Sequence, residues 1–187
     1  MSAKKNIRAL VETAVLVALA FALSFVTPFR RLMPQGGSVT VASMLPILLI
    51  GMRHGLPWGL GGAAAYSLLQ ALQEGALAPP ASGLSTYALM LLLDYLLAFG
   101  ALGLSALFRR MKYGLIIAAP VCLTLRYVCH VASGVILWGS YAWEGWGALA
   151  YSLAYNATYM LPEIVITTGV ALLLYKTVPK KYMTGAN

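Results

Sequence analysis

The chain has 187 residues, of which 60% are hydrophobic and only 10% are charged, and its formal net charge is +8. Soluble domains are about 45–50% apolar and about 25% charged, and a chain of this length fits a single domain, so its excess apolar residues must face lipid. This composition excludes intrinsic disorder, a fibrous protein and a disulfide-stapled secreted module.

Six apolar segments follow one another along the chain, at approximately 9–27, 40–52, 56–73, 84–107, 114–138 and 148–175. Four of them reach the ~20 residues that a helix needs to cross a bilayer. The second is short and carries Pro46, so we expect a tilted or broken helix, and the small residues of the third allow neighbouring backbones to approach closely. Glu12 and the lack of a clear cleavage site favour a retained first helix over a signal peptide. We predict an all-α fold: one integral membrane domain over residues 1–187, a six-helix bundle.

The basic residues set the expected orientation. With the N-terminus inside, the cytoplasmic segments hold ten of the thirteen, namely Lys4, Lys5, Arg8, Arg53, Arg109, Arg110, Lys112, Lys176, Lys180 and Lys181. The outside then holds only Arg30 and Arg31, so the positive-inside rule predicts that both termini are cytoplasmic. Because these charges lie in short clusters between apolar spans, we expect no nucleic-acid binding, despite the net charge.

Polar and aromatic side chains of four segments fall at one depth in this topology, in the outer half of the membrane. They are Tyr66 and Gln70 in the third segment, Tyr87, Asp94 and Tyr95 in the fourth, His130, Gly134 and Trp138 in the fifth, and Tyr151, Tyr155, Asn156 and Tyr159 in the sixth. Ionisable residues inside a bilayer are costly and usually functional, so we predict a ligand pocket. One carboxylate among aromatic rings suits a flat, cationic or amine-bearing ring. The external segment Met33–Ser38 is a candidate lid.

Structural roles are also open for these residues. The alternatives are an interfacial aromatic belt for Trp138, Trp143 and Trp146, a bond to a neighbouring helix for His130, an ion pair with Arg126 for Asp94, and interhelical hydrogen bonds for Gln70 and Asn156. The chain has no G-x-x-x-x-G-K-S/T phosphate loop and no H-E-x-x-H zinc motif, so it cannot hydrolyse ATP by itself and no metal site is predicted. An intramembrane hydrolase would have to use Asp94, His130 and Ser133, and a base and nucleophile three residues apart on one helix are poorly arranged.

Several stretches resemble a known family over nearly the whole chain. They are Met33–Ser38 (MPQGGS), Leu93–Phe99 (LDYLLAF), Arg126–Gly134 (RYVCHVASG) with Trp138, Tyr141–Gly147 (YAWEGWG) and Tyr151–Pro162 (YSLAYNATYMLP). The chain resembles the thiamine-specific S components of energy-coupling factor (ECF) vitamin transporters. The resemblance implies six helices, both termini inside, and an outward cavity capped by the first loop. It also implies a multi-pass subunit of the bacterial plasma membrane, in contact with lipid, that binds thiamine and is not an enzyme.

The resemblance also implies roles for individual residues. Asp94 with Tyr95, His130 with Gly134 and Trp138, and Tyr151 with Asn156 fall on the family's binding positions. Trp138 and His130 would pack against the rings of thiamine, Asp94 would answer its positive charge, and Asn156 would hydrogen-bond the aminopyrimidine. Some relatives carry Trp at the position of Tyr66 and a further Trp in the first loop, which is absent here.

Partners follow from the same resemblance. The expected partners are an ECF coupling transmembrane protein and two ATP-binding subunits, with Ala14 and Ala18 on the first helix as the docking residues. No cofactor is expected, although bound thiamine can co-purify. The alternative functions are an S component for another heteroaromatic vitamin or precursor, and an intramembrane hydrolase.

Overall fold

The computed structural model describes residues 3–27, 36–76, 78–80 and 83–184, and within them the secondary structure is entirely helical. The elements are α1 (Ala3–Ser24), α2 (Leu45–His54), α3 (Leu56–Glu74), α4 (Leu84–Met90), η2 (Leu91–Leu97), α5 (Ala98–Gly103), η3 (Leu104–Phe108), α6 (Gly114–Leu137), η4 (Gly139–Tyr141), α7 (Ala148–Thr177) and α8 (Lys180–Thr184). Elements α4 to η3 follow one another without a break and form one helical rod. The all-α prediction is confirmed, but the described chain has seven helices rather than six, because the short α8 was not predicted.

Four helices are long and apolar enough to cross a membrane: Ala3–Ser24, Leu84–Phe108, Gly114–Leu137 and Ala148–Thr177. Their outward faces carry large apolar side chains with high exposure, such as Leu153 and Val165 on α7 and Leu107 on η3. Apolar side chains exposed in this way suit contact with lipid, because lipid replaces water as the solvent of these surfaces.

The short helix α2 forms the centre of the core. Pro46 lies in its first turn, where the missing N–H of proline costs nothing because the first N–H groups of a helix have no partner within it. Pro46 therefore starts α2 instead of breaking it. Ile47, Leu48 and Ile50 of this helix are completely buried.

Glycines allow the helices around α2 to pack backbone to backbone. A Cβ atom at Gly59 of α3 would lie 2.6 Å from the carbonyl oxygen of Gly103 in α5 and 2.9 Å from the Cα atom of Gly51 in α2. No side chain fits in so little space, so three helices can meet here only at glycine. This crossing closes one half of the bundle.

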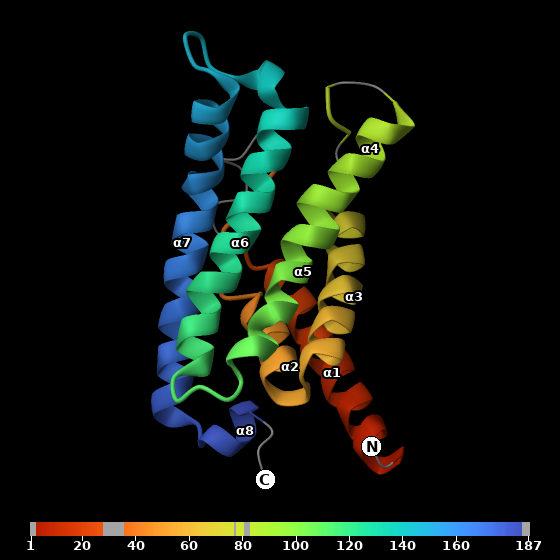
Figure 1. Cartoon of the computed structure of the whole chain (residues 1–187), viewed down its shortest axis with the longest axis vertical. Coiled ribbons are helices and arrows are strands. Elements are labelled where there is room, and N and C mark those ends of the chain that lie inside the picture. Colours follow the sequence, from red (N-terminus) through yellow and green to blue (C-terminus); the bar gives the residue numbers. More distant parts are fainter. Residues whose placement is uncertain (1–2, 28–35, 77, 81–82, 185–187) are drawn as a thin grey trace.

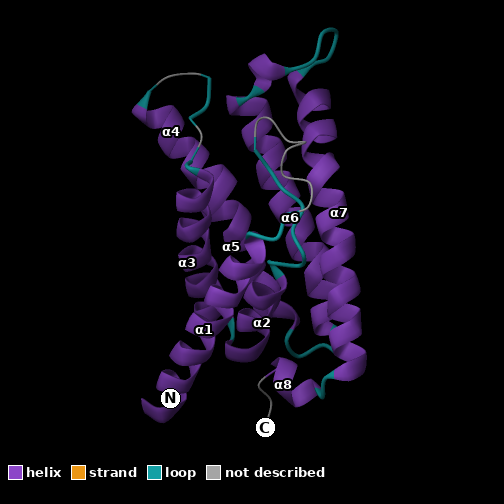
Figure 2. Cartoon of the chain, turned by 180° about the vertical axis from the view of Figure 1, so that it is seen from behind, coloured by secondary structure: helices purple, strands orange, loops and turns teal. Residues whose placement is uncertain are grey.

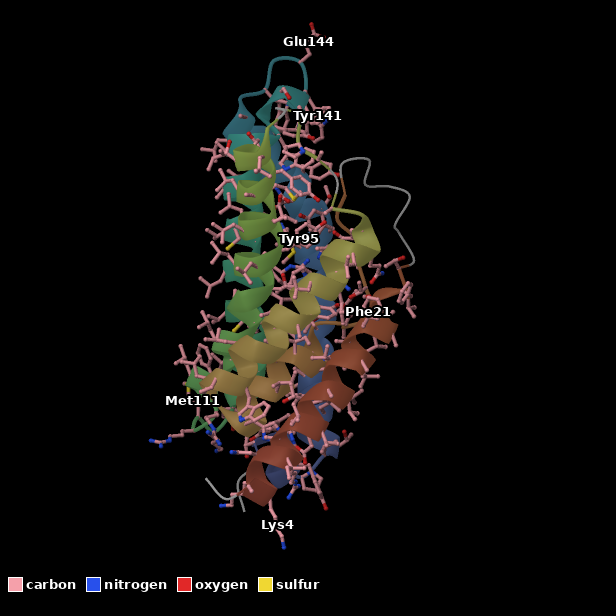
Figure 3. The ribbon with its side chains drawn as sticks, turned by 90° about the vertical axis from the view of Figure 1, so that its right-hand side faces the viewer. Lys4, Phe21, Tyr95, Met111, Tyr141 and Glu144 are labelled. Atoms are coloured by element: carbon pink, nitrogen blue, oxygen red, sulfur yellow. The ribbon has the colours of Figure 1, made fainter. Side chains whose placement is uncertain are left out.

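The helices are arranged as a long bundle whose two ends differ (Figure 1). Helices α6 and α7 run side by side over almost their full length, and α3 lies beside the rod formed by α4 to η3. The start of α1 and α8 lie at one end, and the α6–α7 connection lies at the other. Figure 3 places Lys4 and Met111 towards the first end, Tyr141 and Glu144 at the second, and Tyr95 between them.

Candidate functional site

A cavity of about 250 Å³ lies between α3, the α4–η3 rod, α6 and α7, in the half of the bundle away from α8. Its volume is close to the lower end of the range for small-molecule pockets. Eight of the nine residues expected from the sequence line it: Gln70, Asp94, Tyr95, His130, Gly134, Trp138, Tyr151 and Asn156. The structure thus brings side chains from four helical segments together around one space.

Asp94 and Tyr95 enter the cavity from η2, which is a π-helix. Adjacent residues of a regular α-helix point about 100° apart, and a wider turn changes the direction of the side chains that follow it. Both residues line the cavity, and Tyr95 is also stacked near Phe99 in the core, with ring centroids 6.5 Å apart. Single π-turns inside α-helices are frequent at functional sites.

A chain of polar contacts connects Arg126, His130 and Asp94. The Nε–H of Arg126 donates to Nε2 of His130 over 3.2 Å, and Nδ1 of His130 lies 3.0 Å from Oδ1 of Asp94. Arginine can only donate, so Nε2 of His130 is the acceptor and the ring carries its proton on Nδ1. His130 is therefore neutral and donates to the carboxylate. Asp94 does not pair directly with Arg126, as one sequence alternative suggested, but through this imidazole.

The second oxygen of Asp94 is also occupied. Ser133 donates its hydroxyl to Oδ2 over 2.5 Å, and Ser133 is completely buried. Serine and histidine thus bond to two different oxygens of the same carboxylate and not to each other. A hydrolase would need the imidazole to take the serine proton, and this arrangement does not provide it.

The wall formed by α6 and α7 depends on Gly134. A Cβ atom there would overlap the hydroxyl of Ser152, so glycine allows the two helices to touch at this level. Asn156, one turn beyond Ser152, donates through Nδ2 to the Ser152 carbonyl (2.9 Å) and to the His130 carbonyl (3.4 Å). Its Oδ1 accepts the hydroxyl of Tyr159. These bonds fix the amide orientation before any ligand arrives.

The described part of the segment before α2, residues 36–44, passes over α6 beside α7 in the view from behind (Figure 2). The hydroxyl of Tyr155 donates to the Gly36 carbonyl over 2.9 Å. Gly37 has φ +91°, and a Cβ atom there would lie 2.6 Å from the ring of Tyr159. Gly36, Gly37 and Ser38 line the cavity, whereas residues 33–35 of the predicted lid lie outside the described residues.

Tyr66, the ninth expected residue, does not line the cavity but belongs to the buried core. It is 1% exposed, its hydroxyl donates to Ser43 over 3.2 Å, and its ring meets Phe99 edge to face. Trp143 and Trp146 are about half exposed at the end of the bundle and contact each other edge to face, as an interfacial belt would require.

Ala14 and Ala18 do not line the cavity. Both are exposed on α1, whereas Thr13, Val17 and Ala20 of the same helix are buried. The two alanines therefore do not pack inside the described bundle.

Several cavity residues were not singled out as site residues from the sequence. They include Ser24, Gln73, Glu74 and Arg126. The sequence contains one indication for Glu74: it follows Tyr66 and Gln70 at the same four-residue spacing, which places all three on one face of α3. Glu74 lies just beyond the third apolar segment, 56–73, so a search for polar residues inside the segments does not reach it.

Comparisons with known proteins identify relatives of this chain. Residues 10–183 match the sequence family described as "Thiamine transporter protein (Thia_YuaJ)". A protein of Bacillus subtilis (strain 168) named thiamine transporter ThiT is 35% identical, and the alignment covers 96% of each chain. The protein of the same name from Lacticaseibacillus paracasei is 26% identical over 98% of this chain and 94% of its own.

A solved structure described as ThiT from Listeria monocytogenes superimposes with a TM-score of 0.75 at 25% identity, covering 95% of this chain and 98% of that one. Sequence and fold therefore agree over nearly the whole length. With four helices long and apolar enough to cross a membrane, the protein is a multi-pass membrane protein, and it belongs to the thiamine transporter protein family.

Proposed function

We propose that this protein is the thiamine-binding subunit of an ECF uptake system in the plasma membrane. The observation that carries the proposal is the cavity, which combines aromatic faces, an orienting amide and an excess of acidic groups in a chain of the thiamine transporter family. Thiamine is a permanent cation with two flat rings, and such a cavity complements both features.

The proposed binding residues have different chemical roles. Trp138 and His130 present flat faces to the rings, and Tyr151 and Tyr155 extend this aromatic wall with centroids 5.6 Å apart. Asn156 presents a fixed amide for the aminopyrimidine, and Asp94 holds the imidazole in one tautomer and orientation. Because these groups are positioned by bonds within the protein, little ordering cost remains for binding.

Native mass spectrometry of the purified protein, followed by calorimetric titration of the ligand-free form, tests the proposal. The expected result is one bound thiamine per chain. Tight binding of a different heteroaromatic vitamin with none of thiamine would refute thiamine as the substrate. Conversion of the bound ligand on incubation would instead indicate a hydrolase, whereas a binding subunit returns it unchanged.

The proposed transport system also needs partners, because the sequence contains no phosphate loop with which to hydrolyse ATP. We propose that a coupling transmembrane protein docks on α1, where Ala14 and Ala18 lie on the exposed face among large apolar side chains such as Val15. Small residues on an exposed apolar face let another helix approach closely. The proposed bundle crosses the membrane six times within one domain, with both termini cytoplasmic and its outer faces in lipid.

Docking is tested by replacing both Ala14 and Ala18 with Trp. The matched control is Leu19→Trp, at another exposed position of the same helix. The double variant is expected to bind thiamine normally but to lose co-purification with the coupling protein and ATPases, while the control keeps both. Loss of thiamine binding together with assembly would show that the stripe supports the bundle itself and would refute the docking proposal.

A further inference from the structure

The described side chains that line the cavity carry an unbalanced negative charge. They include two carboxylates, Glu74 and Asp94, and one permanently charged base, Arg126. His130 adds no charge, because its Nε2 accepts from Arg126 and so carries no proton. The sum is one net negative charge, which a monocationic ligand would neutralise.

Asp94 is already engaged within the protein. Through the imidazole of His130 it is connected to the guanidinium of Arg126, which is 7% exposed and lies 4.1 Å from the ring centroid of Phe99. Both carboxylate oxygens of Asp94 accept hydrogen bonds, one from His130 and one from Ser133. A ligand would have to compete with these bonds for its charge.

Glu74 is in a different situation. It is the last residue of α3, it lines the cavity, and its side chain is open to solvent. Its Oε2 accepts one hydrogen bond, from the hydroxyl of Tyr95 over 3.0 Å. Of the nearby polar groups, the amide of Gln70 and the hydroxyl of Ser24 donate to Oε1 of Gln73 and not to Glu74. Within the described part of the chain, the ion pairs do not include Glu74.

We propose that Glu74 is the counter-ion for the cationic ring of the ligand, a role that the sequence resemblance assigns to Asp94. The inference rests on the proposed function, thiamine binding, and adds to it the residue that selects for positive charge. Asp94 then acts as a positioning residue, which holds His130 and the buried Arg126 in place. A ligand seated in the cavity shields Glu74 from water and so strengthens the attraction.

The substitution Glu74→Gln isolates the charge. The amide oxygen of glutamine can still accept the hydrogen bond from Tyr95, and the position is at an exposed helix end, where the change leaves the core intact. The matched control is Glu144→Gln, which removes the same charge from the far end of the α6–α7 connection, where Glu144 points away from the bundle (Figure 3). It reports any effect of net charge alone.

The experiment is calorimetric titration of the full chain with two ligands: thiamine, and its neutral isostere in which carbon replaces the quaternary nitrogen of the thiazolium ring. For Glu74→Gln we expect at least tenfold weaker binding of thiamine and less than twofold change for the isostere. Glu144→Gln should leave both affinities unchanged. For Asp94→Asn we expect both ligands to weaken by similar factors, because that change disturbs the shape of the site and not the charge seen by the ligand.

The outcomes distinguish the counter-ion role of Glu74 from the proposed thiamine binding. Equal losses for both ligands in Glu74→Gln, or unchanged thiamine affinity, would overturn the counter-ion role while thiamine binding by the unmodified protein stands. A loss confined to thiamine in Asp94→Asn, with none in Glu74→Gln, would return the role to Asp94. If the unmodified protein bound no thiamine, the proposed function itself would fail.

Discussion

Glu163 offers a direct test of how the segment before α2 is held. It lies on α7, one turn beyond Tyr159, and is completely buried. Its carboxylate accepts two hydrogen bonds from Thr40, one from the backbone N–H and one from the hydroxyl, both over 2.7 Å. Thr40 follows Ser38, which lines the cavity. We therefore expect Glu163→Gln to destabilise the protein and weaken ligand binding together.

The magnitude follows from the two bonds. A hydrogen bond to a charged group contributes about 1.5–3 kcal/mol, and the glutamine amide oxygen can replace only one of the two acceptors. The expected loss is about 2 kcal/mol for the other bond. For a chain of this length, 1 kcal/mol corresponds to about 2–4 °C in Tm, so the apparent Tm should fall by roughly 4–8 °C.

The assay is a thermal scan of tryptophan fluorescence in detergent, at one fixed scan rate because membrane proteins often unfold irreversibly. Thr40→Val is the matched partner, since it removes the hydroxyl and keeps the backbone N–H. Each single variant removes a hydrogen bond between Thr40 and Glu163, and the double variant cannot lose the same bond twice. Its Tm shift should therefore be clearly smaller than the sum of the single shifts. Fully additive shifts, or an unchanged Tm in Glu163→Gln, would refute the anchoring role.

Three further changes test the wall of the cavity. Gly134→Ala should cost about 1–3 kcal/mol through overpacking against Ser152, and should weaken thiamine binding in a titration; an unchanged Tm would contradict the tight helix contact. Thiamine should quench tryptophan fluorescence mainly through Trp138, so Trp138→Phe should remove most of the quench and Trp143→Phe little of it; the reverse result would move the site. Gly37→Ala should lower the apparent Tm, because alanine at φ +91° is strained and its Cβ meets an aromatic ring of α7, and a normal Tm would argue against this backbone path.

The sequence predicts the helical, membrane-embedded character of the chain because both depend on averages over many residues. The small residues of the third segment also predict a close helix contact, and Gly59 makes it with Gly103. The π-helical turn at Leu91–Leu97 escapes prediction, since that stretch has the same apolar composition as an ordinary helix. The short α8 lacks the length from which periodicity can be recognised.

The sequence predicts part of the candidate site, because residues expected at the same depth in the membrane can be grouped together. Clustering by depth selects Gln70, Asp94 and Asn156, and the structure has all three around one cavity. It misses Glu163, because a lone acid deep in an apolar helix gives no sign of its partner. Thr40 lies 123 positions away along the chain, and only the fold brings the two together.

Charge balance is the property of the site that sequence patterns represent least well. A carboxylate inside a membrane helix suggests a ligand for a cation, and on that basis Asp94 was the natural choice. The bonds to Ser133 and His130 change the interpretation, because they occupy both oxygens of Asp94 and connect it, through the imidazole, to the buried Arg126. Glu74 lies just beyond the third apolar segment of the sequence, yet its charge has no basic partner among the described side chains around the cavity. Which acid attracts a ligand therefore depends on which acid is left unpaired once the helices have packed.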